Sequence, residues 1–166
     1  MSSTGTLAQI SVVGAGNWLI SHDRVGPRVL ELLEGRYGPE VDLCHTGTSG
    51  LELLDHLHGQ KLFLVVDACT LGGPAGTLRI VDRPDLSQAP ASTASVHQIG
   101  PLEALAVAHH LFPEQLPCHI QLILAETEGI DDKLFERVCR DAVDHVDQQI
   151  REALALDAAG VEVAQA

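Results

Sequence analysis

Two aspartates and a histidine, Asp23, Asp67 and His97, have the types and positions needed to do chemistry at one place. Asp23 follows the first apolar segment, Asp67 ends the most strongly apolar one, and His97 lies in a long segment rich in Pro, Ser and Ala. Two carboxylates and one imidazole form an O,O,N set that suits a divalent transition metal such as nickel, zinc or cadmium. Three protein ligands leave positions for water or for a group from another molecule. The sequence therefore indicates a metal site, provided that the fold brings the three side chains together.

Each of these residues also has a structural interpretation. Asp23 by itself fits the N-cap of a helix that begins near Val25. Asp67 is harder to explain in this way, because a charge at the end of a buried strand is costly unless it is paired or ligated. His97 by itself is an ordinary loop histidine. Two carboxylates brought together also require a cation, since otherwise one of them takes up a proton.

Other motifs give weaker indications of function. The segment Gly14-Ala15-Gly16-Asn17 begins like a dinucleotide-binding fingerprint, but the third glycine is missing and the following helix begins too late. The sequence contains no GxSxG nucleophile elbow. Trp18, the only tryptophan, lies in a loop beside the predicted site. It is either a docking anchor for a partner or a cover over the core.

Short apolar segments that alternate with helical patterns must position these residues. Strands are predicted at 10–14, 41–44, 61–67, 76–81 and 120–125, and helices at 25–33, 51–57, 102–109 and 132–156. Such alternation predicts a three-layer α/β/α fold, in which helices cover both faces of a twisted, mainly parallel five-stranded sheet. Ligands of such open sheets bind beyond the carboxyl ends of the strands, where Asp23, Asp67 and His97 all fall.

Composition limits the class of protein. We predict one domain over residues 10–156, with an N-terminal arm over 1–9 and a flexible tail over 157–166. The formal net charge of -13 argues against a nucleic-acid partner, because phosphate binding requires clustered Lys and Arg. Four widely spaced cysteines fit reduced thiols better than disulfides. Without a leader pattern or an apolar stretch of about 20 residues, we expect a cytoplasmic protein with no membrane partner.

Four short motifs follow one another along nearly the whole chain. They are GAGNWLISHDRVG at residues 14–26, GTSGLELL at 47–54, VVDA at 65–68 and SVHQIG at 95–100. In order and separation they resemble the GxGNxLxxDDxxG, GTxGxxLL, VDA and SxHQxG motifs of the NiFe-hydrogenase maturation endopeptidases. The resemblance extends from about residue 10 to residue 155, and the fold of that family agrees with the pattern of strands and helices.

The resemblance implies a function. Members of this family remove a C-terminal extension from the hydrogenase large-subunit precursor after nickel has been inserted. They are thought to sense the nickel with three residues that correspond to Asp23, Asp67 and His97, which are then both metal ligands and catalytic residues. The chain is thus expected to be a monomeric, nickel-dependent endopeptidase whose nickel comes with the substrate, another divalent metal being an expected substitute in vitro. The residues expected to recognise the substrate are Asn17, Trp18 and His45.

Two positions depart from the family pattern. His22 stands where many relatives have the first acid of a pair, and His45 stands where many have an aspartate tied to substrate selectivity. These differences indicate a different hydrogenase class as the substrate, or for His45 an additional nitrogen near the site. The lack of a Ser or Cys nucleophile arrangement favours attack by water. The alternative function is a non-catalytic nickel-sensing or chaperone module for hydrogenase assembly, which uses the same residues without cutting.

Overall fold

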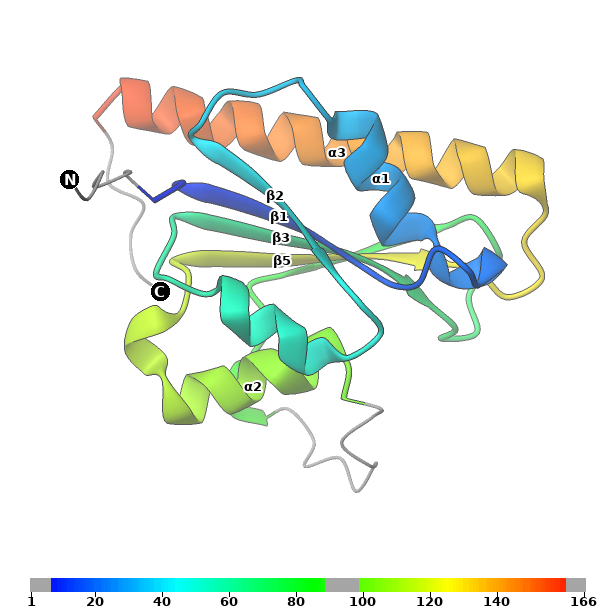
Figure 1. Ribbon diagram of the computed structural model, residues 1–166, viewed down its shortest axis with the longest axis horizontal. Coiled ribbons are helices and arrows are strands. Elements are labelled where there is room, and N and C mark those ends of the chain that lie inside the picture. The colour runs from blue at the N-terminus through cyan, green and yellow to red at the C-terminus, as the bar shows by residue number, and fades with distance from the viewer. Residues whose placement is uncertain (1–6, 89–98, 161–166) are drawn as a thin grey trace.

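The computed structural model describes residues 7–88 and 99–160, which form one five-stranded sheet in the order β2-β1-β3-β5-β4 (Figure 1). Four strands run parallel, and β4 pairs antiparallel with β5 at one edge. The strands are β1 (Ile10–Ala15), β2 (Val41–Thr46), β3 (Leu62–Cys69), β4 (Leu78–Asp82) and β5 (His119–Glu126).

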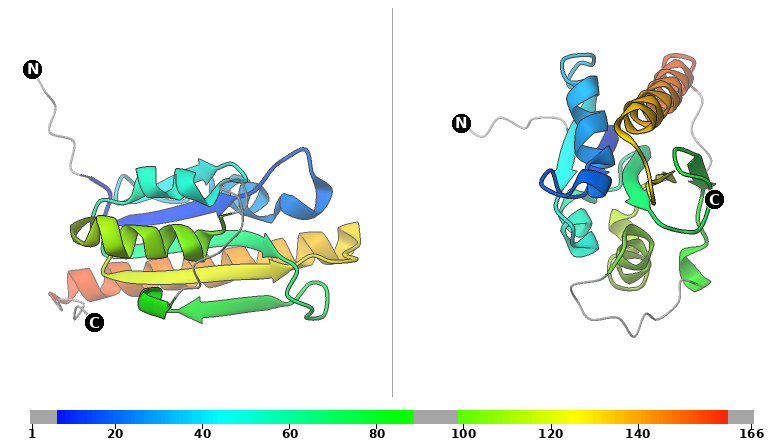
Figure 2. Two further views of the ribbon diagram at one scale, coloured as in Figure 1. Left: turned by 90° about the horizontal axis from the view of Figure 1, so that it is seen from below. Right: turned by 90° about the vertical axis from the view of Figure 1, so that its right-hand side faces the viewer.

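Helices cover both faces of the sheet (Figures 1 and 2). One face carries α1 (Val25–Leu33) and α3 (Asp132–Ala158), and the other carries α2 (Pro101–Leu111) with the 3-10 helix η2 (Gly50–His56). The predicted three-layer α/β/α fold with a mainly parallel five-stranded sheet is confirmed. The helix expected at 51–57 is 3-10 rather than α-helical. Further 3-10 turns are η1 (Ser21–Asp23), η3 (Leu86–Gln88) and η5 (Pro113–Gln115).

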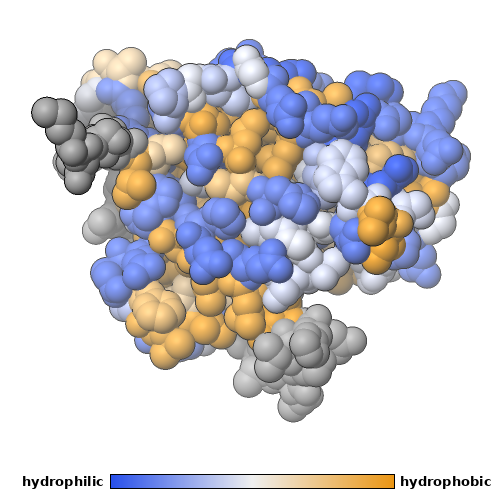
Figure 3. All heavy atoms as spheres, viewed as in Figure 1, coloured by the Kyte–Doolittle hydropathy of each residue, from blue (hydrophilic) through white to orange (hydrophobic). Residues whose placement is uncertain are grey.

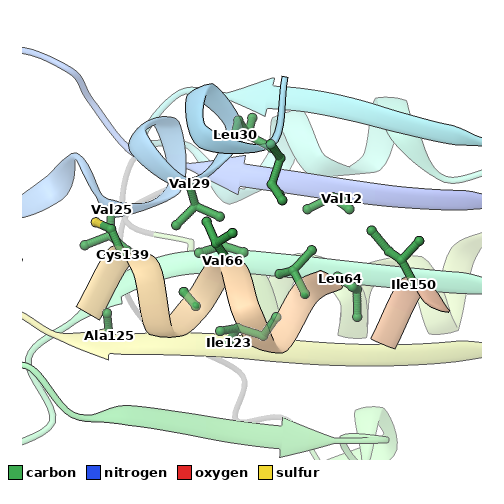
Figure 4. Packing of buried hydrophobic residues seen from close by; sticks show 14 of the residues in the cluster. Val12, Val25, Val29, Leu30, Leu64, Val66, Ile123, Ala125, Cys139 and Ile150 are labelled. Atoms are coloured by element: carbon green, nitrogen blue, oxygen red, sulfur yellow. The ribbon is translucent and has the colours of Figure 1, made fainter. Parts of the chain in front are cut away.

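The core has two parts because the sheet is covered on both sides. Val66 and Ile123 pack toward α1 and α3 (Figure 4), whereas Phe63 and Val65 belong to the cluster that faces α2. This explains why the first five residues of β3 are all apolar and all buried: a central parallel strand has no solvent-facing side.

The longest helix, α3, packs along its apolar stripe and begins at a capped end. The Asp131 side chain accepts a hydrogen bond of 2.8 Å from the Leu134 amide. The helix continues to Ala158, two residues beyond the end expected from its pattern. Within 7–88 and 99–160, no helix combines the length and apolar character that crossing a membrane requires. All four cysteines are free thiols, of which Cys44 and Cys139 are buried.

Two glycines let α1 approach the sheet closely. A Cβ atom on Gly26 would lie 2.2 Å from the carbonyl oxygen of Ala15 and 2.7 Å from that of Val66. A Cβ atom on Gly14 would lie 2.5 Å from the carbonyl oxygen of Gly26. Because neither glycine has a side chain, the beginning of α1 sits directly on β1 and β3. This contact fixes the position of η1, which immediately precedes α1.

Candidate active site at the carboxyl end of the sheet

The candidate site lies at the carboxyl ends of the neighbouring strands β1 and β3. After β1 the chain continues to one side of the sheet, and after β3 it continues to the other side. From β1 the chain passes through α1 to β2 on one side, whereas the strand on the other side of β3 is β5. In open α/β sheets, a crevice forms outside the carboxyl ends of two strands at such a reversal. The segments that follow β1 and β3 carry Asp23 and Asp67, so the topology brings two of the predicted site residues to this crevice.

Asp23 lies in η1 and its carboxylate stabilises the preceding loop. Its Oδ2 accepts a hydrogen bond of 2.9 Å from the Asn17 amide. The N-cap interpretation of Asp23 is wrong: Arg24 occupies the N-cap position of α1, without a capping side-chain hydrogen bond. The loop also requires Gly16, whose φ is +128° and whose Cβ would lie 2.1 Å from the Asp23 carbonyl oxygen. The carboxylate is therefore held by the loop beside β1, not by the end of the helix.

Asp67 occupies the sixth position of β3 and is partly buried. Its Oδ1 accepts a hydrogen bond of 2.8 Å from the Ala68 amide. Burial, opposed by the Ala68 hydrogen bond and aided by the negative charge of Asp23, raises the pKa of Asp67 to about 7. Within the described parts of the chain, neither carboxylate takes part in an ion pair. Two acidic groups thus influence each other without a cation between them.

His97 lies outside the described residues, so the structure gives the positions of only two of the three predicted ligands. The described chain resumes at Ile99, whose carbonyl oxygen accepts a hydrogen bond of 2.9 Å from the Gly50 amide. Gly50 follows the carboxyl end of β2, and a Cβ there would lie 2.4 Å from the Ile99 oxygen. Among residues 7–88 and 99–160, no group of three His, Cys, Asp or Glu side chains is arranged to hold a metal.

The predicted substrate-recognition residues surround the loop after β1. The Asn17 side chain accepts a hydrogen bond of 2.9 Å from the Leu19 amide, which shapes the loop. His45 is exposed on β2, and its Nε2 lies 3.3 Å from the Gly16 carbonyl oxygen. Trp18 is 47% exposed and Leu19 is 92% exposed. Figure 3 shows apolar side chains at the surface over this loop, so Trp18 is available to a partner.

Glu126, which the sequence reasoning did not single out, is a third acidic residue at this end of the sheet. It ends β5, is 1% exposed, and pairs in register with Cys69. Its Oε1 and Oε2 lie 2.8 and 3.2 Å from the Leu71 amide, which donates to them. Burial and the neighbouring Glu126 raise the pKa of Cys69 to about 11, so this thiol is not a nucleophile. The signal that marks Asp67, an acid at the end of a buried strand, also marks Glu126.

Glu126 and Asp67 have different uses. The Glu126 carboxylate accepts from the turn that follows β3, whereas within the described residues the Asp67 carboxylate accepts only from the amide of its own neighbour. The arrangement of Asp23 and Asp67 can do two things chemically: take up a proton, or share a cation. Oxygen donors from two carboxylates fit a divalent metal, and such an ion would remove the repulsion between them.

Comparisons with known proteins agree with this architecture. The family model described as hydrogenase maturation protease (HycI) matches residues 27–153. The hydrogenase expression/formation protein HoxM of Cupriavidus necator is 34% identical over 140 residues, which cover 81% of this chain and 68% of that protein. HoxM of Azotobacter vinelandii is 34% identical over 130 residues, which cover 76% of this chain and only 62% of that protein. Among solved structures, the hydrogenase maturating endopeptidase HybD of Escherichia coli has a TM-score of 0.72 at 25% identity, covering 87% of this chain and 93% of that one.

Proposed function

This chain belongs to the hydrogenase maturation proteases, a family of endopeptidases, and from that premise we propose that it removes the C-terminal extension of a NiFe-hydrogenase large-subunit precursor in a nickel-dependent manner. The resemblance seen in the sequence motifs is confirmed at the level of the family and its enzyme class. The substrate, the nickel dependence and the roles of individual residues belong to the proposal.

One observation carries the proposal: Asp23 and Asp67 act on each other electrostatically while no cation of the described chain pairs with either. Such a pair is costly to keep charged, and the cost disappears when a divalent ion arrives. If the ion is carried by the substrate, a precursor without nickel meets two repelling carboxylates. A precursor with nickel meets a matching site. The pair then distinguishes loaded from empty precursor by charge.

The three proposed ligands have separate tasks. Asp23, fixed by the Asn17 amide, and Asp67, fixed by the Ala68 amide, would hold the nickel from two adjacent strand ends. His97 would complete the set; Ile99, two residues later, is anchored at this same end of the sheet. When bound, nickel supplies positive charge that polarises a neighbouring peptide carbonyl. A carboxylate oxygen of the pair is the group that accepts a proton from the attacking water.

The decisive experiment compares two forms of one precursor. Purified protein is incubated with nickel-loaded and with nickel-free large-subunit precursor, and intact mass is recorded over time. We expect loss of the C-terminal extension from the loaded form only. Equal cleavage of both forms would contradict nickel-gated recognition. Formation of a nickel-dependent complex without any change in precursor mass would instead establish the non-catalytic sensing module.

A further inference from the structure

Beside the candidate site, two adjoining hollows form one groove between η1 and the loop that joins β5 to α3. The first, of about 260 Å³, lies against the beginning of α3 and includes Arg24 and Phe135 in its walls. The second, of about 370 Å³, extends to Thr70, three residues after Asp67. Both are lined by His22, Thr127 and Gly129. Because His22 directly precedes Asp23, the groove adjoins the segments that carry both carboxylates.

Thr127 carries a hydroxyl group to which no other group in the described parts of the chain is hydrogen-bonded. The residue is 2% exposed, and its Oγ1 is buried without a hydrogen-bond partner in the described chain. The backbone of Thr127 is satisfied: its amide donates to the Cys69 carbonyl over 3.1 Å, and its carbonyl accepts from the Ile130 amide over 3.2 Å. A buried hydroxyl without a partner destabilises the fold, because it has lost its hydrogen bonds to water. Thr127 lines both hollows, so its side chain borders the groove, and a rotation about χ1 would be needed to turn the hydroxyl toward a ligand there.

The walls of the groove are shaped for a chain rather than for a compact ligand. Gly129 has a φ of +70°, and a Cβ added there would meet no atom within 4 Å, so this part of the floor is open. Arg24 is held in the wall, with its guanidinium 5.0 Å from the centre of the Phe135 ring and its Nε donating to the Ser21 carbonyl. Compact ligands favour enclosed, mainly apolar pockets, whereas polar and backbone groups along an open groove suit an extended polypeptide.

We propose that the groove between His22 and Thr127 holds an extended segment of the substrate chain next to the cleavage position, with the Thr127 hydroxyl bonded to its backbone. This rests on the proposed endopeptidase function. In this arrangement His22 lies between the two hollows and contacts a side chain of the bound segment, which makes it a specificity-determining residue. Thr127 is a positioning residue, because it orients the segment and does not touch the reacting bond.

The first test replaces Thr127 with valine, which keeps the shape and removes the hydroxyl. We expect KM for the nickel-loaded precursor to rise about 5- to 10-fold with kcat nearly unchanged, as for loss of one hydrogen bond. Thermal stability should stay equal or rise, since an unused buried hydroxyl has been removed. The matched control is Thr77→Val, because the Thr77 hydroxyl already donates to the Pro74 carbonyl outside the groove. An unchanged KM for T127V, whatever its stability, would overturn the role of this hydroxyl.

The second test locates the substrate directly. A photoreactive residue replaces the exposed Glu128 on the groove wall, and another replaces Asp85 at the far end of the sheet as the control. Crosslinking to nickel-loaded precursor is followed by peptide mapping. We expect the Glu128 probe to label residues within a few positions of the cut, and the Asp85 probe not to. Labelling only elsewhere on the precursor overturns the groove assignment even when the wild-type protein cleaves. Absence of cleavage by the wild-type protein overturns the proposed function separately.

Discussion

The two ends of the sheet treat charged and polar side chains in opposite ways. At the amino end, groups are matched: Lys61 pairs with Asp157, and Asp82 lies 2.5 Å from His119. At the carboxyl end, the charge of Asp23 opposes ionisation of Asp67, and neither carboxylate has an ion-pair partner in the described chain.

This difference between the two ends of the sheet indicates which residues stabilise the fold and which serve function. Gln121 extends the matched network at the amino end, since it donates to Asp82 over 3.0 Å and lies 2.6 Å from His145. Satisfied networks of this kind stabilise one arrangement of the core. Unmatched charges destabilise the fold, and they persist where a ligand completes them. We therefore expect variants at the amino end to change stability, and variants at the carboxyl end to change activity.

The largest expected effect is on cleavage. Asp67→Asn removes the carboxylate while keeping the size of the side chain, so kcat/KM for nickel-loaded precursor should fall at least about 100-fold. The matched control is Asp82→Asn at the opposite end, which should stay within about 2-fold of the wild-type value. Both are measured by precursor mass over time. Comparable losses in the two variants would remove the distinction between the ends.

The second-largest expected effect is on stability, where Asp67→Asn and Asp82→Asn should change the free energy of unfolding in opposite directions. Burial raises the pKa of Asp67 to about 7, so folding favours the protonated carboxyl group. Above that pH the carboxyl group is ionised in the folded protein, and its charge destabilises the fold. In metal-free buffer at pH 8, Asp67→Asn should raise the free energy of unfolding by about 2 kcal/mol. Asp82→Asn should lower it by about 1 kcal/mol, since it weakens two hydrogen bonds. Urea denaturation of both variants distinguishes the cases; destabilisation by Asp67→Asn would contradict the unmatched-charge argument.

The contributions of the two ends of the sheet to stability should also depend on pH in opposite directions. The raised pKa of Asp67 means that its contribution favours folding at low pH and is lost as pH rises toward about 7. Burial lowers the pKa of His145, so its contribution is present above about pH 6.5, the usual histidine value, and is lost as pH falls below that. Denaturation of the metal-free Asp67→Asn and His145→Gln variants from pH 5 to 8 should each remove one of the two slopes. Identical pH profiles for these two variants would refute the assignment.

The smallest expected effect concerns the Lys61–Asp157 pair, which is partly exposed. The Lys61 and Asp157 side chains are 45% and 28% exposed. Solvent screening leaves such a pair about 0–1 kcal/mol, so Lys61→Met should change the free energy of unfolding by less than about 1 kcal/mol. The change should shrink further in 1 M salt, which the same denaturation experiment measures. A larger decrease in the free energy of unfolding that does not depend on salt would contradict the interpretation of Lys61 and Asp157 as a solvent-screened ion pair.

The fold was predictable from the sequence because its signals are local or periodic. The apolar run of β3 and the apolar stripe of α3 both identify their elements without knowledge of neighbours. Asp67 was predictable for the same reason, since an acid directly after a buried run is visible in one segment. The placement of these acids at one end then followed from parallel pairing.

The details that were not predictable depend on partners far apart in the chain. The sequence also allowed Asp23 to cap α1, but the Asn17 amide binds it because Gly16 turns the loop back. Glu126 binds the Leu71 amide, 55 residues away, and only the pairing of β3 with β5 creates that contact. The Thr127 hydroxyl has no hydrogen-bond partner among residues 7–88 and 99–160, and no local sequence pattern indicates this.

The close approach of α1 to the sheet, which Gly14 and Gly26 allow, also ties the candidate site to the pairing of β1 with β3. In the register of the sheet, Gly14 lies opposite Val66, and this pairing joins segments that are synthesised far apart. Contacts of such separation form late, because the intervening chain must first lose its freedom. Until that pairing closes, Asp23 and Asp67 belong to independent segments. A chain in which β1 and β3 have not yet paired therefore does not hold these two carboxylates at one place.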